Sequence, residues 1–208
     1  MISNEHVSFN TRKRRTEFVH QTYRKFFGDS ILDVGCFEAP LRELAEDSSY
    51  TGIDIVGNPD VKVNLEEVNS LPFEDDQFDF VMCIEVLEHI DNLHDIFEDL
   101  FRVASKYVLV SLPNCWCVAR RKIERGKGEF SHYGLPQEKP LDRHKWFVNI
   151  TQARQFFEGR KDGAFELKDL RIVEKPRMLP VVLYRKLLFP GERYYNRYAH
   201  TLFALYEK

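Results

Sequence analysis

The 208-residue sequence has no apolar run close to the roughly 20 residues that a membrane-spanning helix needs. Its first residues lack the basic segment followed by an apolar one that marks a secretory signal. It also lacks internal repeats, low-complexity segments and any change of composition that would mark a linker. These absences predict one domain over residues 1–208, in the cytoplasm, since single domains commonly contain about 100–200 residues.

The sequence also has few cysteines and a small net charge. The four cysteines form no Cys-x-x-Cys pair, which argues against a structural zinc site. Cys36 and Cys83 fall at the ends of predicted strands, where small side chains can pack beside a cofactor. The net charge is −3, so no overall basic field favours nucleic acid. With 43% hydrophobic and 30% charged residues, the composition is typical of a globular protein.

The most informative segments are residues 30–39 and 50–55. The first is a short apolar run that ends in an acid and a glycine, and the second is an apolar run that ends near Asp54. This pattern predicts a βαβ unit for a nucleoside-like ligand. Gly35 permits a tight turn, and Asp54, 21 residues after Asp33, is placed to bind two ribose hydroxyls.

The residues of this turn favour S-adenosylmethionine over a dinucleotide. A pyrophosphate-binding turn needs three glycines, whereas Phe37 and Ala39 occupy the later two positions, and Asp33 would repel a phosphate. At this point the sequence resembles the class I S-adenosylmethionine-dependent methyltransferases, whose first motif is an acid followed by glycines at alternate positions. Asp33, Gly35 and Cys36 match that motif, and Phe37 and Ala39 depart from it.

The resemblance is strong over residues 28–112 and holds in outline beyond them. It implies an α/β, Rossmann-like, doubly wound fold, with a mostly parallel sheet, an antiparallel C-terminal strand and helices on both faces. After the first strand, which begins at Ser30, hydrophobic periodicity predicts strands over residues 50–55, 61–63, 78–84, 107–111, 165–173 and 199–206. It predicts helices over residues 10–27, 40–47, 85–90, 93–105 and 151–158, the last capped by Thr151.

In this family the cofactor lies at the strand ends. The resemblance implies a cofactor site made of Asp33, Gly35, Cys36, Phe37, Asp54, Ile55, Asn64, Leu65, Cys83 and Arg15. Asn64, or Glu66 or Glu67 instead, would contact the adenine amino group. Arg15, on a helix predicted to cover the cofactor, would reach the methionine carboxylate. The basic run that contains it is otherwise typical of a solvated helix face.

A second informative stretch follows the strand over residues 78–84. Glu85, Glu88 and His89 have the i, i+3, i+4 spacing that places side chains on one face of a helix. With His144 they could bind a divalent metal, Mg or Mn. The Glu-x-x-Glu-His pattern is similar to that of the small-RNA 2′-O-methyltransferases and the ubiquinone-biosynthesis O-methyltransferases, in which these residues bind a cation that gathers the acceptor hydroxyls. The alternative is a metal-free site in which these residues order the cofactor pocket.

Two irregular segments, residues 114–146 and 176–198, are predicted to face each other as lids over the acceptor. The first leaves the carboxyl end of a strand, where α/β proteins place their ligands. It contains His144 and His132, the candidate catalytic bases. The second is aromatic and aliphatic, so it could instead form a homodimer contact or touch a membrane surface.

These observations favour an S-adenosylmethionine-dependent methyltransferase that methylates an oxygen of a small molecule. One alternative is an RNA 2′-O-methyltransferase with a divalent metal, which the basic segments at residues 12–15 and 120–125 support and the acidic net charge opposes. Another is a catalytically silent, cofactor-binding regulatory protein, which Phe37 and Ala39 would allow. A nucleotide-sugar or dinucleotide oxidoreductase is a more distant alternative.

Overall fold

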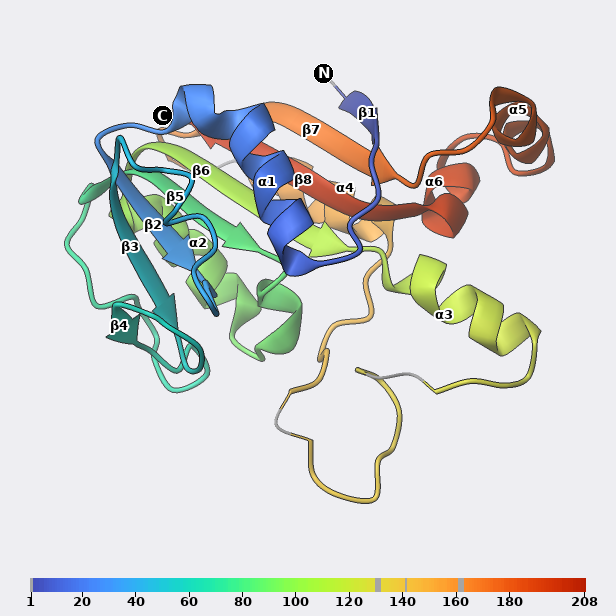
Figure 1. Cartoon of the computed structure of the whole chain (residues 1–208), viewed down its shortest axis with the longest axis horizontal. Coiled ribbons are helices and arrows are strands. Elements are labelled where there is room, and N and C mark those ends of the chain that lie inside the picture. Colours follow the sequence, from blue (N-terminus) through green and yellow to red (C-terminus); the bar gives the residue numbers. More distant parts are fainter. Residues whose placement is uncertain (1, 130–131, 141, 161–162) are drawn as a thin grey trace.

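The computed structural model describes residues 2–129, 132–140, 142–160 and 163–208. In these residues one sheet of eight strands has the order β1-β7-β8-β6-β5-β2-β3-β4 (Figure 1). The strands are β1 (Ile2–His6), β2 (Ser30–Val34), β3 (Ser49–Asp54), β4 (Val61–Lys62), β5 (Phe78–Ile84), β6 (Ala104–Pro113), β7 (Glu166–Glu174) and β8 (Ala199–Glu207). Strand β8 is antiparallel to its neighbours β6 and β7, and the other neighbouring pairs are parallel. The predicted doubly wound fold is confirmed.

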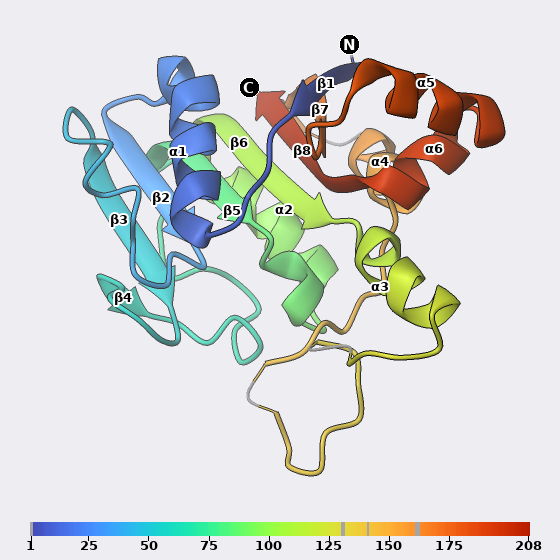
Figure 2. The ribbon, with the colours of Figure 1, turned by 45° about the vertical axis from the view of Figure 1, so that its right-hand side comes forward.

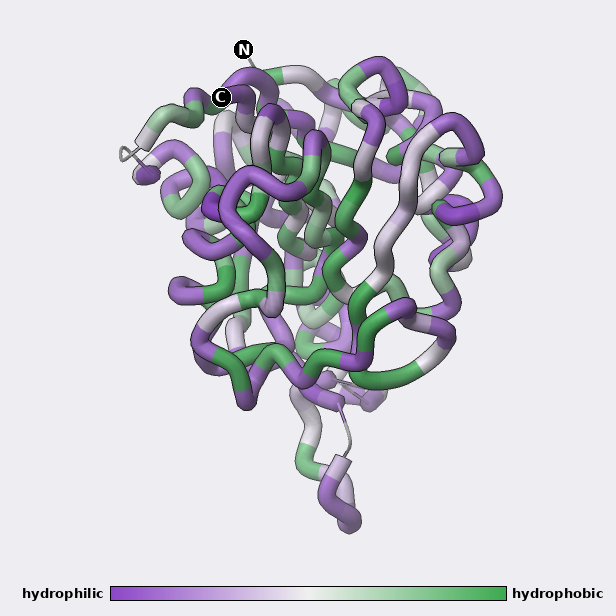
Figure 3. The backbone as a smooth tube through the Cα atoms, turned by 90° about the vertical axis from the view of Figure 1, so that its left-hand side faces the viewer, coloured by the Kyte–Doolittle hydropathy of each residue, from purple (hydrophilic) through white to green (hydrophobic). Residues whose placement is uncertain are grey.

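The helices are α1 (Arg12–Tyr23), α2 (Leu93–Val103), α3 (Cys115–Glu124), α4 (Ile150–Gly159), α5 (Leu179–Leu188) and α6 (Glu192–Tyr198), with short 3-10 turns η1 (Arg24–Phe26) and η2 (Leu87–His89). Helix α1 lies on one face of the sheet, and α2 and α4 lie on the other (Figures 1 and 2). Each face of the sheet has its own apolar core. Val19 and Phe203 belong to the core on the α1 face, and Phe97 and Phe157 belong to the core on the face covered by α2 and α4. Hydrophobic segments of the chain run through the middle of the molecule (Figure 3). None of the helices in these residues is long and apolar enough to cross a membrane.

Two predicted helices are wrong because local geometry prevents a regular helix, whereas the helix predicted over residues 151–158 is confirmed as α4 and only its predicted cap is wrong. Residues 40–47 form turns, since the chain leaves Ala39 in a left-handed conformation and must start β3 at Ser49. In residues 85–90 only η2 is helical, because Glu85 has a φ of 53°. The cap of α4 is Asn149, which forms a capping box with Gln152, and Thr151 lies inside the helix.

The two segments predicted to be irregular contain helices. Residues 115–124 form α3, because the Asn114 side chain caps the helix by accepting a hydrogen bond from the Cys117 backbone. Residues 179–198 contain α5, with a proline in its first turn, and α6. Residues 130, 131 and 141 of the first predicted lid lie outside the described residues. Strand β1, which extends the sheet beside β7, was not predicted.

Candidate active site

The loop after β2 and the end of β3 meet at the carboxyl edge of the sheet. The Asp54 carboxylate accepts hydrogen bonds from the backbone N–H of Phe37 (2.8 Å), Ile55 (2.7 Å) and Val56 (3.1 Å). An ionised carboxylate offers about four lone-pair sites; Oδ1 accepts two of these bonds and Oδ2 accepts one, so Oδ2 keeps one site. Asp54 therefore orders the loop and can still accept a ribose hydroxyl through Oδ2.

The backbone of this loop compensates for its missing glycines. Gly35, Phe37 and Ala39 have φ values of 81°, 51° and 51°, so all three adopt the left-handed conformation that glycine normally supplies. A left-handed residue with a Cβ costs about 1–2 kcal/mol. Gly35 cannot carry one, since a Cβ there would lie 2.2 Å from Val86 Cγ2. The loop therefore follows the backbone path of a glycine-rich turn, with local strain at Phe37 and Ala39.

Asp33 lies buried beneath this loop and accepts a hydrogen bond from the Tyr50 hydroxyl at 2.7 Å. Burial raises the pKa of Asp33 to about 6, and the Tyr50 bond opposes that rise. Arg12 and Arg15 of α1 face it across a small cavity of about 20 Å³ that Cys36 also lines. The Arg12 guanidinium lies 4.7 Å from the centre of the Phe37 ring, so α1 closes over the loop.

The remaining predicted cofactor residues surround the same edge. Ile55 is exposed at the end of β3, and Cys83 is buried in β5 opposite Val34. Leu65 is buried, and the Asn64 amide donates to Glu67 at 2.7 Å, so two of the three candidate adenine contacts lie in one hydrogen-bonded turn. In this structure these two side chains bind each other.

Arg15 and Glu85 form an ion pair at the carboxyl end of β5. Burial lowers the pKa of Arg15 to about 10. The second oxygen of Glu85 accepts a hydrogen bond from the Thr201 hydroxyl of β8 at 2.6 Å. Glu85 therefore bridges α1 and β8, and it does not share a helix face with Glu88 and His89 as the spacing predicted.

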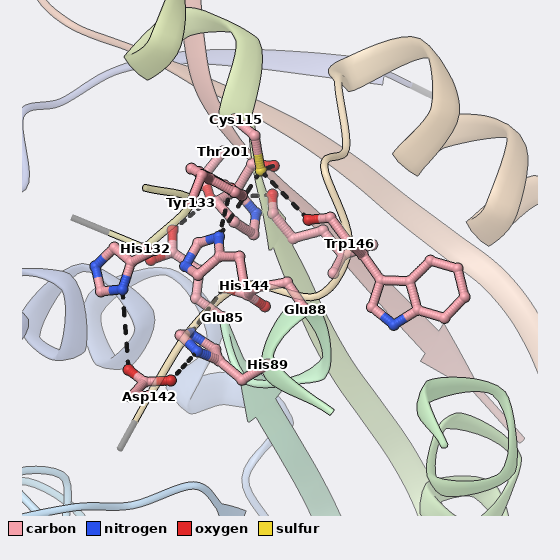
Figure 4. A network of polar contacts seen from close by, with 12 residues as sticks. Glu85, Glu88, His89, Cys115, His132, Tyr133, Asp142, His144, Trp146 and Thr201 are labelled. Carbon is pink, nitrogen blue, oxygen red and sulfur yellow. Dashed lines mark hydrogen bonds and ion pairs between the residues drawn. The ribbon is translucent and has the colours of Figure 1, made fainter. Parts of the chain in front are cut away.

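Beside this ion pair, Glu88, His89 and His144 bring ligand atoms within 4.8 Å of one another (Figure 4). The His144 ring stacks on His132, with centroids 4.6 Å apart. Asp142 accepts a hydrogen bond from Nδ1 of His89 at 2.5 Å and lies 4.0 Å from Nδ1 of His132. The two candidate bases and two of the other predicted metal ligands are thus gathered in one cluster.

Backbone contacts between distant segments hold the histidine cluster. The Glu88 carbonyl accepts hydrogen bonds from the N–H groups of Lys145 (2.8 Å) and Trp146 (3.3 Å). The Trp146 indole donates to the Ile90 carbonyl at 2.8 Å. These bonds attach the chain next to His144 to η2, so the position of His144 depends on contacts between residues more than 50 positions apart.

Burial also favours the neutral forms of Glu88, His89 and His144. Burial raises the pKa of Glu88 to about 8, and its Oε2 has no hydrogen-bond partner in the described part of the chain. Burial, together with His89 and His132, lowers the pKa of His144 to about 3. The pKa of His89 is lowered for the same reason. Neutral imidazoles beside an unpartnered carboxyl oxygen can accept protons or bind a cation.

Comparison with known proteins identifies the family. A family model described as a methyltransferase domain matches residues 10–160. The chain belongs to the methyltransferase domain family. The predicted membership of the class I S-adenosylmethionine-dependent methyltransferases is confirmed, and the chain is an enzyme domain of the transferase class.

Relatives of the methyltransferase domain are similar over part of their length. Sterol 24-C-methyltransferase erg6 of Schizosaccharomyces pombe is 34% identical over 36% of this chain and 25% of that protein. Uncharacterized protein MJ0638 of Methanocaldococcus jannaschii is 35% identical over 33% of each. The chain thus spans a quarter to a third of these relatives.

Solved structures share the fold of the methyltransferase domain. A SAM-dependent methyltransferase from Archaeoglobus fulgidus has a TM-score of 0.56 at 16% identity, with 95% of each chain covered. The small RNA methyltransferase HEN1 has a TM-score of 0.65 at 17% identity, covering 98% of this chain and 26% of that one. At such identities the likeness is one of fold.

A cleft of about 500 Å³ joins the two parts of the candidate site. Arg12 and Arg15 line it on the cofactor side, and Glu88, His132 and His144 line it on the other. An acceptor in this cleft would lie beside both the cofactor loop and the histidine cluster.

Two residues of this candidate site, Asp142 and Thr201, were not predicted from the sequence. Asp142 and Thr201 bind His89 and Glu85, and the hydroxyl of Tyr133 hydrogen-bonds Nδ1 of His144. Asp142 lies two residues before His144, and that short spacing of two titratable groups was the available signal. Thr201 lies within an apolar strand and carried no comparable signal.

Proposed function

We propose that the methyltransferase domain transfers the methyl group of S-adenosylmethionine to a hydroxyl oxygen of a small molecule. The observation that supports this is the histidine cluster at the edge of the 500 Å³ cleft. A hydroxyl acceptor must lose its proton during transfer, and neutral imidazoles can take it. An amine acceptor can attack as the free base and would need no such cluster.

The transfer itself requires mainly alignment. The methyl group is carried on a positively charged sulfur, so an acceptor oxygen held in line with it gains rate from positioning and from exclusion of water. Asp54 would fix the ribose of the cofactor, and the Arg15–Glu85 ion pair would lie between cofactor and acceptor. His144, held by Tyr133 and stacked on His132, would face the acceptor oxygen.

In a metal-dependent form of this proposal, Glu88, His89 and His144 would hold a divalent cation; His144 would then be a ligand, and the cation would promote loss of the hydroxyl proton in its place. Two imidazoles and one carboxylate are a known ligand set for such ions. Glu88 offers an unpartnered oxygen, and His89 donates its other ring N–H to Asp142, as metal-binding histidines usually do. The ion would supply positive charge that orients acceptor oxygens and favours the alkoxide. Glu85 contributes no ligand while it is paired with Arg15 and Thr201.

Methyl transfer from isotopically labelled S-adenosylmethionine tests the acceptor class. The acceptors are a matched set: an aromatic diol, its mono-methyl ether and the corresponding amino compound. We expect label in the diol, with loss of at least about 100-fold in kcat/KM in His144→Asn, the order of effect of removing a proton-transfer group. Label only in the amine, or unchanged rates in His144→Asn and His132→Asn, would contradict the proposal.

Calorimetry with Mn²⁺ tests the cation without any acceptor. We expect Glu88→Gln to weaken Mn²⁺ binding by at least about 100-fold, because it removes a charged ligand and retains its size. Glu85→Gln is the matched control and should bind Mn²⁺ as the wild type does. Equal Mn²⁺ binding by wild type and Glu88→Gln would rule out the cation while leaving hydroxyl methylation intact.

An RNA 2′-hydroxyl is a second candidate acceptor. The fold likeness to HEN1, together with the gathered Glu88, His89 and His144, supports it. The comparison is between a short RNA with a 2′,3′-diol at its 3′ end and the same RNA ending in a 2′-deoxynucleotide. Label in the first RNA and not in the second would establish this candidate in place of the small molecule.

A further inference from the structure

The methyltransferase domain carries its charge very unevenly. Residues 115–127 and 175–198 contain 11 lysines and arginines and 2 acids, which gives a net charge of +9. The rest of the chain contains 19 lysines and arginines and 31 acids, which gives a net charge of −12. These two segments form α3, α5 and α6, which lie together at one end of the molecule in both ribbon views (Figures 1 and 2). We call this surface, residues 115–127 and 175–198, the basic end.

Exposed aliphatic side chains lie among these charges. No residue of α5 is buried, and Leu179, Leu183 and Leu187, one turn apart along it, are 68%, 59% and 80% exposed. The Arg185 guanidinium and the Lys186 ammonium lie 4.4 and 5.2 Å from the ring centres of Tyr198 and Tyr194 on α6. The basic side chains therefore turn towards α6, and the leucines form an outer stripe.

An apolar groove continues this surface. It has a volume of about 420 Å³ and lies between α3 and α6, with Trp116, Ile123 and Phe189 among its apolar walls and Arg120, Arg193 and Arg197 beside them. Helix α3 separates it from the histidine cluster, since Cys115, Val118 and Lys122 line a different cavity with His144. The groove is thus a feature distinct from the acceptor cleft.

We propose that the basic end docks on a membrane surface that contains anionic lipids. A helix with an aliphatic stripe flanked by lysine and arginine is the pattern of an interfacial helix, which buries its apolar side at the acyl boundary and places its charges at the headgroups. Contiguous exposed apolar side chains are typical of interaction sites. This inference is independent of the acceptor proposed above.

The charge and the leucines of the basic end favour a membrane over a second copy of the chain or a nucleic acid. A second copy docking through the same surface would bring two faces of charge +9 together, which opposes a symmetric dimer. Nucleic acid would match the charge but not the aliphatic stripe, because single strands are bound by aromatic stacking and phosphate contacts. Anionic lipid matches both the charge and the leucines.

Co-sedimentation of the full chain with phosphatidylcholine vesicles, with and without phosphatidylglycerol, tests the proposal. We expect binding to the anionic vesicles that weakens as salt is added. Leu183→Ser with Leu187→Ser should weaken it at least about tenfold. Arg177→Gln should weaken it about fivefold, the effect of one basic residue near an anionic surface.

Val61→Ser with Lys62→Gln, on β4 at the opposite edge of the sheet, is the matched control and should bind as the wild type does. The replaced leucines are exposed, so unchanged thermal melting checks that the variant is folded. Three results would overturn the proposal: no preference for anionic vesicles, equal sedimentation of the leucine variant, or a dimer in light scattering that the leucine variant abolishes. RNA binding that survives the leucine change, without vesicle binding, would identify a nucleic-acid surface instead.

Discussion

The two halves of the candidate active site, the predicted cofactor half and the predicted acceptor half, are held together in different ways. In the cofactor half, Asp33, Gly35 and Asp54 lie at the ends of two adjacent parallel strands, and Asp54 orders the turn through hydrogen bonds across 17 residues or fewer. In the acceptor half, His144 is held through Lys145 and Trp146, whose partners Glu88 and Ile90 are more than 50 residues away.

The cofactor half is thus positioned by local contacts, and the acceptor half by long-range contacts. A strand end followed by a tight turn fixes the cofactor residues wherever the sheet forms. The acceptor residues depend on packing between α3, η2 and the returning chain, so single substitutions there should affect the acceptor cluster and spare cofactor binding. Four substitutions test this contrast.

The largest effect is expected from Asp54→Ala, which should remove cofactor binding. The change deletes the ribose acceptor and three hydrogen bonds to the loop, and two charge-assisted bonds alone are worth about 3–6 kcal/mol. Calorimetry with S-adenosylmethionine, S-adenosylhomocysteine and NAD measures it. Asp60→Ala is the control, because Asp60 also binds a backbone N–H, that of Gly52, but lies outside the turn. Wild-type affinity in Asp54→Ala would contradict the cofactor assignment.

Asn114→Ala should destabilise the acceptor half and leave cofactor affinity intact. Asn114 caps α3, and its amide donates to the carbonyls of Tyr195, Asn196 and Ala199, so the change leaves buried carbonyls unpaired. We expect a loss of about 3 kcal/mol in the free energy of unfolding. Asn149→Ala removes the cap of α4 and should cost about 1 kcal/mol. Equal losses in the two variants would show that Asn114 acts only as a helix cap.

The pH dependence of stability should reveal Asp33. Because burial raises the pKa of Asp33 to about 6, the folded state keeps its proton while the unfolded state loses it near pH 4. Its contribution is therefore fully present below about pH 4 and is lost as the pH rises through about 6, by roughly 2 kcal/mol. Denaturant titrations of wild type and Asp33→Asn between pH 4 and pH 7 measure it. A difference between the two proteins that stays constant with pH would show that Asp33 is charged throughout.

Ala39→Gly should have the smallest effect. Glycine relieves the left-handed strain of about 1–2 kcal/mol but costs about 0.5–1 kcal/mol of chain entropy, so we expect a stabilisation below about 1 kcal/mol. Gly35→Ala is the opposing control and should destabilise the domain, because its Cβ would overlap Val86. Thermal melting compares the two. A destabilised Ala39→Gly variant would mean that packing of the Ala39 methyl group stabilises the fold by more than the left-handed strain destabilises it.

The sequence was informative where side chains repeat with a regular period. Residues 78–84 were predicted as a strand and are one, because a parallel strand buried on both faces needs a continuous apolar run. Residues 115–124 were predicted to be irregular and form α3. The helix forms because Asn114 caps it and Ala119 is buried on one side, while Val118 and Ile123 remain exposed on others. That exposure weakened the periodic signal.

The sequence by itself determined the family, the strands at whose ends the predicted cofactor residues lie, and the residue types of the candidate site. Those features depend on short patterns, since an acid and a glycine at a strand end are sufficient to shape a turn. Only the tertiary structure decided that Glu85 binds Arg15 and Thr201, that His144 meets Glu88 and His89, and that α5 exposes its leucines at the basic end. These arrangements arise from burial, hydrogen bonds and charge between elements far apart in the chain, which no local pattern specifies.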